Sequence, residues 1–73
     1  MIDPYERLGN AVIIQAAKDY RRALKKLKRN PENGEAKQTK SEIERFFCSD
    51  WFRELTSADG EMIMKKIREE FKI

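Results

Sequence analysis

The stretch AVIIQAAKDYRRALKKLKR, residues 11–29, decides the fold. It contains neither Gly nor Pro and consists largely of good helix formers. At about 100° per residue, its apolar side chains fall on one face of a helix, as in helices that pack on a protein core. This apolar stripe comprises Val12, Ile13, Ala16, Ala17, Tyr20, Ala23, Leu24 and Leu27. The sequence therefore predicts a long amphipathic helix here.

The opposite face of the same helix is strongly basic. Residues 18–29 hold seven cations and one anion, Asp19, so this segment has a net charge of +6, against +3 for the whole chain. The cations lie on one continuous arc, which also includes Ile14. We call them the basic strip: Lys18, Arg21, Arg22, Lys25, Lys26, Lys28 and Arg29. The pattern predicts that the basic strip faces solvent.

The residues before this stretch contain a second signal for a helix start. Asp3 has the position of an N-cap, Pro4 that of the first helical residue, and Glu6 completes a capping box. Gly9-Asn10 would then interrupt or bend the helix, because Gly costs about 1 kcal/mol against Ala inside a helix. We expect one long helix that runs on to Arg29, with a kink at Gly9-Asn10 as the open alternative.

Turn-forming residues separate this helix from the rest of the chain. Residues 30–34, NPENG, end the first helix, because Pro31 disfavours a helical conformation at Asn30. A second helix is predicted from about Glu35 to Cys48. Its apolar side consists of Ala36, Ile43, Phe46 and Phe47.

The last third of the chain predicts a short and a longer helix. Ser49 has the position of an N-cap for a helical turn that ends near Leu55, and residues 56–59, TSAD, offer a capping box for a last helix that tolerates Gly60 in its first turn. The apolar residues of that helix are Met62, Ile63, Met64, Ile67 and Phe71. We therefore predict an all-α fold: a single compact three-helix domain over residues 1–73, with a long first helix and a short extra helical turn before the last helix.

Four aromatic residues lie within seven positions at the junction of two predicted helices: Phe46, Phe47, Trp51 and Phe52. Such residues could stack on nucleobases. In a chain this small they are more readily explained as the core, and Trp51 is expected to be the most exposed of them. Cys48, beside them, is expected to be a small buried hydrophobic residue, with Arg45 as weak support for a reactive thiol.

Composition excludes several function classes. Histidine is absent from the 73 residues, which removes the commonest general base and the commonest transition-metal ligand. We expect no enzyme activity, no metal and no cofactor. One cysteine and the lack of an apolar run of about 18 residues favour a cytoplasmic protein that does not enter the membrane.

The basic strip leads to two hypotheses of function. Its length and charge suit a nucleic-acid backbone, with salt-sensitive binding, although a solvated helix face also favours Lys and Arg. A helix-turn-helix over residues 50–72 is disfavoured by four-residue charge pairs such as Glu61 with Lys65. The second hypothesis is a protein-interaction module that self-associates or docks on an acidic partner. Monomer and homodimer both remain open.

Two segments resemble a known family. AVIIQAAKDYRRAL (residues 11–24) and IERFFCSDWFRELT (residues 43–56) are similar to a family of small uncharacterised proteins encoded by prophages and other mobile elements of Gram-positive bacteria. The resemblance implies a setting, a mobile element inside a bacterial cell, and no mechanism. With this setting, the first hypothesis is that the chain is a small non-enzymatic mobile-element accessory protein that binds nucleic acid.

Overall fold

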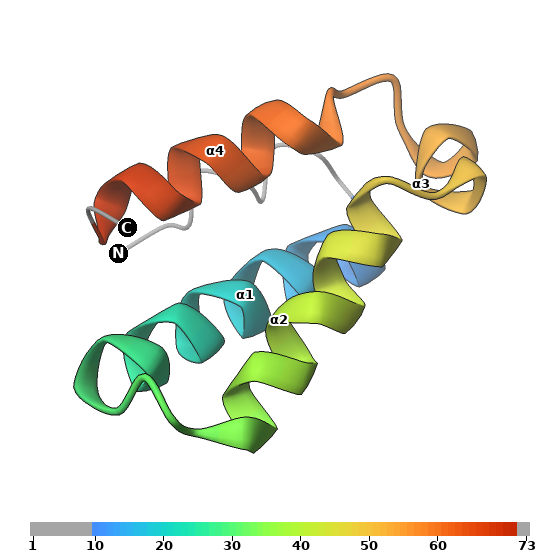
Figure 1. Cartoon of the computed structure of the whole chain (residues 1–73). Coiled ribbons are helices and arrows are strands. Elements are labelled where there is room, and N and C mark those ends of the chain that lie inside the picture. Colours follow the sequence, from blue (N-terminus) through green and yellow to red (C-terminus); the bar gives the residue numbers. More distant parts are fainter. Residues whose placement is uncertain (1–9, 72–73) are drawn as a thin grey trace.

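The computed structural model describes residues 10–71, and this part of the chain forms four helices without a strand (Figure 1). These are α1 (Ala11–Arg29), α2 (Gly34–Phe47), α3 (Asp50–Leu55) and α4 (Gly60–Glu70). Helices α1 and α2 form a hairpin, α4 packs against both of them, and α3 is a short corner after α2. The predicted all-α architecture, with three main helices and a short extra helical turn, is confirmed.

Helix α1 begins at Ala11. Asn10 has extended backbone angles, φ −116° and ψ 116°, and its side-chain oxygen accepts hydrogen bonds from the backbone N–H groups of Val12 (3.0 Å) and Ile13 (3.4 Å). Asn10 therefore caps the helix by satisfying N–H groups that have no partner inside it. The prediction of one helix continuing through Asn10 is wrong, and the proposed start at Asp3 lies outside the described residues.

The other helix ends are also set by short polar side chains. Asn33 caps α2, which starts one residue before the predicted Glu35 and ends at Phe47. Ser49 caps α3, as predicted. The predicted capping box at residues 56–59 is wrong: Thr56 ends α3, and Asp59 caps α4 by accepting from the N–H of Glu61 at 3.0 Å.

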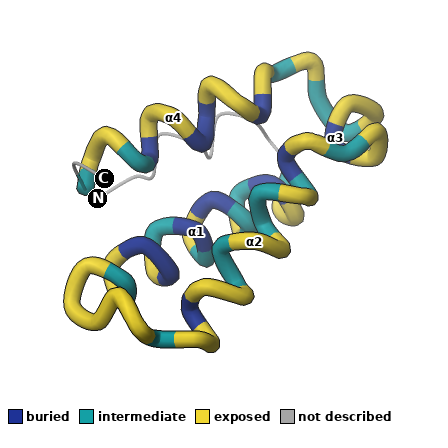
Figure 2. The backbone as a smooth tube through the Cα atoms, viewed as in Figure 1, coloured by how far each residue is buried: buried dark blue, intermediate teal, exposed yellow. Residues whose placement is uncertain are grey.

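The core lies where α1, α2 and α4 meet (Figure 2), and Phe52 of α3 belongs to the same buried cluster. Most of the predicted stripe of α1 is buried or partly buried, but Val12, in the first turn, is 45% exposed. On α4, Ile63, Met64 and Ile67 are buried, whereas Met62 is 53% exposed. The first and third of three consecutive helical residues are about 200° apart around the axis, so Met62 and Met64 cannot both face the core.

The aromatic cluster forms the predicted core at the junction of α2 and α3. Phe47 and Phe52 are buried with their ring centroids 5.3 Å apart, and Phe46 is partly buried between Phe52 and Trp51. Trp51 is 56% exposed, in line with its expected position. Cys48 is exposed, so the prediction of a buried thiol is wrong. Cys48 is the C-cap residue that follows α2, so it lies at the exposed end of the helix and not in its buried face.

Candidate functional site

The basic strip lies on the solvent-facing side of α1, as predicted. Six of its seven side chains are exposed, and Arg21 is half-buried. From Lys18 to Arg29 the strip extends about 16 Å along the helix axis, the axial length of about five nucleotides of one DNA strand. The structure thus presents an exposed row of cations on one rigid element.

Arg21 differs from the other members because it joins two helices. Its Nε lies 3.1 Å from Glu70 Oε2 and its Nη2 lies 3.2 Å from Glu70 Oε1, so the guanidinium binds the carboxylate through two hydrogen bonds. Such bidentate pairs are more specific in geometry than single contacts. Arg21 therefore links α4 to α1, whereas the other six cations of the strip are exposed.

Among these six, Arg22 has a weak internal partner, since its Nη1 lies 3.9 Å from Asp19 Oδ1. The remaining five make no ion pair with any residue of the described range 10–71. Lys26, Lys28 and Arg29 lie in the last turn of α1, where positive charge interacts favourably with the helix dipole. These three cations therefore stabilise the helix end as well as charging the surface.

A second polar cluster, which sequence reasoning missed, joins the three main helices. The Tyr20 hydroxyl of α1 donates to Glu44 Oε2 of α2 at 2.7 Å. The same carboxylate oxygen lies 2.9 Å from Lys40 Nζ and 3.6 Å from Arg68 Nη1 of α4, and Arg68 Nη1 also donates to the Tyr20 hydroxyl at 3.4 Å. Because Tyr20 was expected in the core, the sequence does indicate that its hydroxyl needs a hydrogen-bond partner. It does not identify that partner, since Glu44 lies 24 residues further along the chain.

The cluster changes the acidity of both central groups. Burial, followed by the hydrogen bond to Glu44, raises the pKa of Tyr20 from 10.0 to about 12. Burial alone would raise the pKa of Glu44, but hydrogen bonds from Lys40 and Tyr20 and the charges of Lys40 and Arg68 outweigh it and lower that pKa below 4.5. At neutral pH the cluster therefore holds a neutral phenol against a carboxylate, and its contacts join α1, α2 and α4.

An apolar groove of about 560 Å³ lies between α1 and α2. Its floor is formed by Val12 and Ala16 of α1 and by Ile43 and Phe46 of α2, and carboxylates stand on both walls, Asp19 on α1 and Glu42 on α2. We call this feature the α1–α2 groove. Sequence reasoning did not predict it, because it depends on how the two helices pack.

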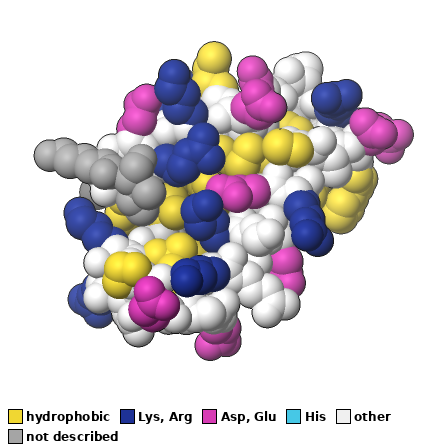
Figure 3. Space-filling model, viewed as in Figure 1, with side chains coloured by type: hydrophobic (Ala, Val, Ile, Leu, Met, Phe, Trp, Pro, Cys, Tyr) yellow, Lys and Arg dark blue, Asp and Glu magenta, His cyan; other side chains and the backbone are white. Residues whose placement is uncertain are grey.

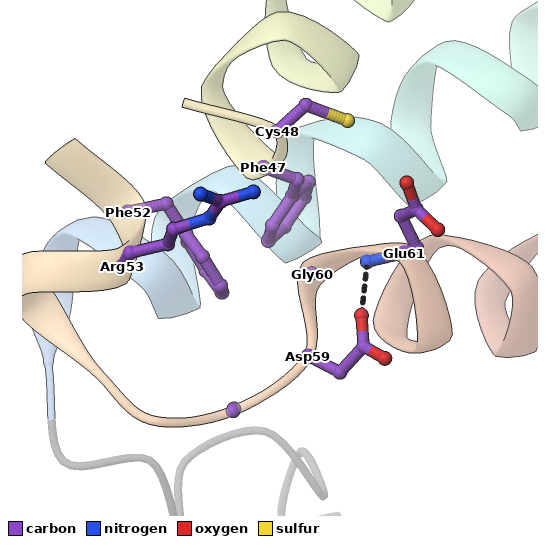
Figure 4. Close-up of a pocket in the computed structure, with 8 residues that line it drawn as sticks. Phe47, Cys48, Phe52, Arg53, Asp59, Gly60 and Glu61 are labelled. Carbon is purple, nitrogen blue, oxygen red and sulfur yellow. Dashed lines mark hydrogen bonds between the residues drawn. The ribbon is translucent and has the colours of Figure 1, made fainter. Parts of the chain in front are cut away.

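A smaller and more polar hollow of about 370 Å³ lies where α2, α3 and the start of α4 meet. Figure 4 shows Phe47, Phe52 and Gly60 around it, with the Arg53 guanidinium extending toward Phe47. The backbone N–H of Glu61, at its edge, already binds the Asp59 cap. Cys48, Asp59 and Glu61 also line the hollow.

The remaining surface is mixed in charge. On the face seen in Figure 3, Lys and Arg side chains alternate with Asp and Glu. Among residues 10–71, acidic and cysteine side chains do not gather in groups of three that could ligate a metal ion. Over the same residues, every helix is too short or too polar to cross a membrane.

Comparison with known proteins finds no relative: no family model, no curated protein and no solved structure matches the chain.

Proposed function

We propose that the chain is a small non-enzymatic accessory protein that binds nucleic acid through the basic strip of α1. The observation that supports this most directly is the row of six exposed cations on one helix face. Five of them, Lys18, Lys25, Lys26, Lys28 and Arg29, have no ion-pair partner within residues 10–71. Phosphate groups can therefore approach these side chains without breaking an interaction that the fold needs.

The binding would be electrostatic and largely independent of sequence. Lys and Arg contacts to phosphates position a protein on nucleic acid but do not read bases. Each phosphate neutralised releases counterions, so affinity falls as salt rises. For a strip that spans about five phosphates, a dissociation constant of about 10⁻⁴ to 10⁻⁶ M at physiological salt is typical of such contacts.

The cellular setting of the proposal is a mobile element in a Gram-positive bacterium, and it rests only on the resemblance of residues 11–24 and 43–56. In that setting the protein acts in the cytoplasm, where the DNA and RNA of a mobile element are found. No cofactor or metal takes part, because phosphate binding by Lys and Arg needs neither.

The test is fluorescence anisotropy of labelled duplex DNA, single-stranded DNA and RNA, titrated with the protein at two salt concentrations. Between about 50 and 200 mM salt, contacts to about five phosphates should weaken duplex binding by two to three orders of magnitude. Binding that is absent at the lower salt concentration, or indifferent to salt, would contradict the proposal.

A pair of charge-matched variants locates the site. Arg22→Glu with Lys25→Glu reverses two cations of the basic strip, and Lys65→Glu with Lys66→Glu makes the same change in net charge on the exposed side of α4. We expect the first double variant to abolish binding and the second to keep most of it. Equal losses would mean that binding follows net charge rather than the strip.

An acidic protein partner is the alternative ligand for the same surface, and a polyanion without phosphates distinguishes the two. Polyglutamate of matched charge should compete weakly with DNA if the strip is suited to a nucleic-acid backbone, since duplex DNA carries about one charge per 1.7 Å of its axis and releases condensed counterions when it is bound. Polyglutamate that competes as well as unlabelled DNA would favour a protein partner.

A further inference from the structure

The α1–α2 groove exposes apolar side chains that residues 10–71 leave partly uncovered. Val12, on its floor, is 45% exposed. Trp51, which is 56% exposed, has its ring centroid 5.4 Å from that of Phe46 and so extends the apolar surface beyond the groove. Contiguous exposed apolar surface with a polar rim is typical of a protein-interaction site.

The two charged groups of the groove are both acids, although the chain has a net charge of +3. Asp19 accepts a hydrogen bond from the Gln15 amide at 2.9 Å, and Glu42 accepts one from the Gln38 amide at 3.2 Å. These amides orient the carboxylates without neutralising them. Glu42 is the freer charge, because Asp19 also lies 3.9 Å from Arg22.

We propose that the α1–α2 groove binds an amphipathic helix of a partner protein, one whose apolar ridge is flanked by Lys or Arg. A groove between two packed helices accepts the side-chain ridge of a third helix. The apolar floor takes the ridge, and the carboxylates on the two walls pair with the flanking cations. This inference is independent of nucleic-acid binding, because the charged side chains that line the groove are carboxylates and not the cations of the basic strip.

The charge pattern also argues against the basic strip as a competing site. A cationic helix is repelled by the strip and by the net positive charge of the chain, so binding of such a helix identifies the local acidic surface. Positive and negative surfaces that match across an interface contribute chiefly to specificity and association rate. The flanking cations therefore select the partner, and the apolar ridge supplies the buried area.

The probe is a labelled helical peptide of about four turns, with leucines along one face and lysines on both sides of them, as helix-in-groove recognition requires. A second peptide carries glutamine in place of every lysine. Binding is followed by anisotropy and by the emission of Trp51, which is the only tryptophan in the chain. We expect the lysine peptide to bind about tenfold more tightly than the glutamine peptide and to shift Trp51 emission to shorter wavelength.

Three variants test whether the peptide binds in the α1–α2 groove. Glu42→Lys should weaken the lysine peptide about tenfold, and Val12→Ser should weaken both peptides, because a rim charge and an apolar contact are lost respectively. Glu69→Lys makes the same charge change on the exposed side of α4 and should have little effect. Circular dichroism verifies that each variant is folded.

The proposal is overturned if the lysine peptide does not bind at all, or if Glu42→Lys and Glu69→Lys reduce its binding equally. Light scattering of the protein alone tests whether a second copy of the chain occupies the groove. A dimer that Val12→Ser converts to a monomer would show that a second copy covers the groove and would also overturn the proposal.

Discussion

Gly60 lies at the first position of α4 and touches the end of α2 through its backbone (Figure 4). A Cβ placed on Gly60 would overlap the carbonyl oxygen of Phe47 and lie 3.0 Å from its carbonyl carbon. These are backbone atoms at the end of a helix, so they cannot rotate away. The missing side chain therefore sets how closely α4 approaches α2. Gly34, at the first position of α2, has no such neighbour within 4 Å.

The two glycines give a matched prediction. We expect Gly60→Ala to lower the free energy of unfolding by about 2 to 3 kcal/mol, because α4 must move away from α2 and loosen the core. Gly34→Ala should raise it by about 0.4 to 1 kcal/mol, since Ala restricts the unfolded chain and nothing obstructs its Cβ. Urea unfolding followed by circular dichroism measures both. A Gly60→Ala protein as stable as the parent would contradict the close approach of the helices.

At the scale of the elements, Ser49 couples two helices. Its hydroxyl donates to the carbonyl of Phe46, at the end of α2, at 2.6 Å, and accepts from the N–H of Phe52, in α3, at 3.2 Å. One side chain thus satisfies an acceptor of the helix that ends and a donor of the helix that begins. This arrangement turns the chain so that Phe52 points back onto Phe47 in the core.

We expect Ser49→Ala to lower the free energy of unfolding by about 1 to 2 kcal/mol, the usual effect of losing an N-cap hydroxyl. Ser41→Ala is the control, because Ser41 lies in the exposed middle of α2 and Ala is the better helix former there. Thermal unfolding of the two variants makes the comparison. If both melt at the temperature of the parent, Ser49 is not a functional cap.

The helices themselves were predictable because strong periodic signals lie within each segment. The 3.6-residue pattern of residues 11–29 defined α1, and residues 30–34 marked its end. The helix starts were less predictable where several capping residues compete. Thr56 and Asp59 are both good caps. Asp59 caps α4, and Gly60, the next residue, meets Phe47, a contact between segments that no local pattern contains.

At the scale of the whole molecule, the sequence located the basic strip correctly but not its internal partners. The pair of Arg21 with Glu70 joins residues 49 apart, so the periodicity of α1 could not separate Arg21 from the exposed cations. The α1–α2 groove was unpredictable for the same reason. Its walls, Asp19 and Glu42, become neighbours only when the hairpin closes.

The cluster around Glu44 links α1, α2 and α4, so its protonation should affect the stability of the whole fold. Because folding lowers the pKa of Glu44, its contribution is present above about pH 4.5 and is lost as the pH falls through the folded-state pKa. We expect Glu44→Gln to be less stable than the parent at neutral pH, and the difference to shrink as the pH falls below about 4.5 and through the lowered pKa of Glu44. Urea unfolding of both proteins across this range measures that difference, in which the effects of the other carboxylates largely cancel. A difference that stays constant with pH would show that the stabilising effect of the cluster does not depend on the charge of Glu44.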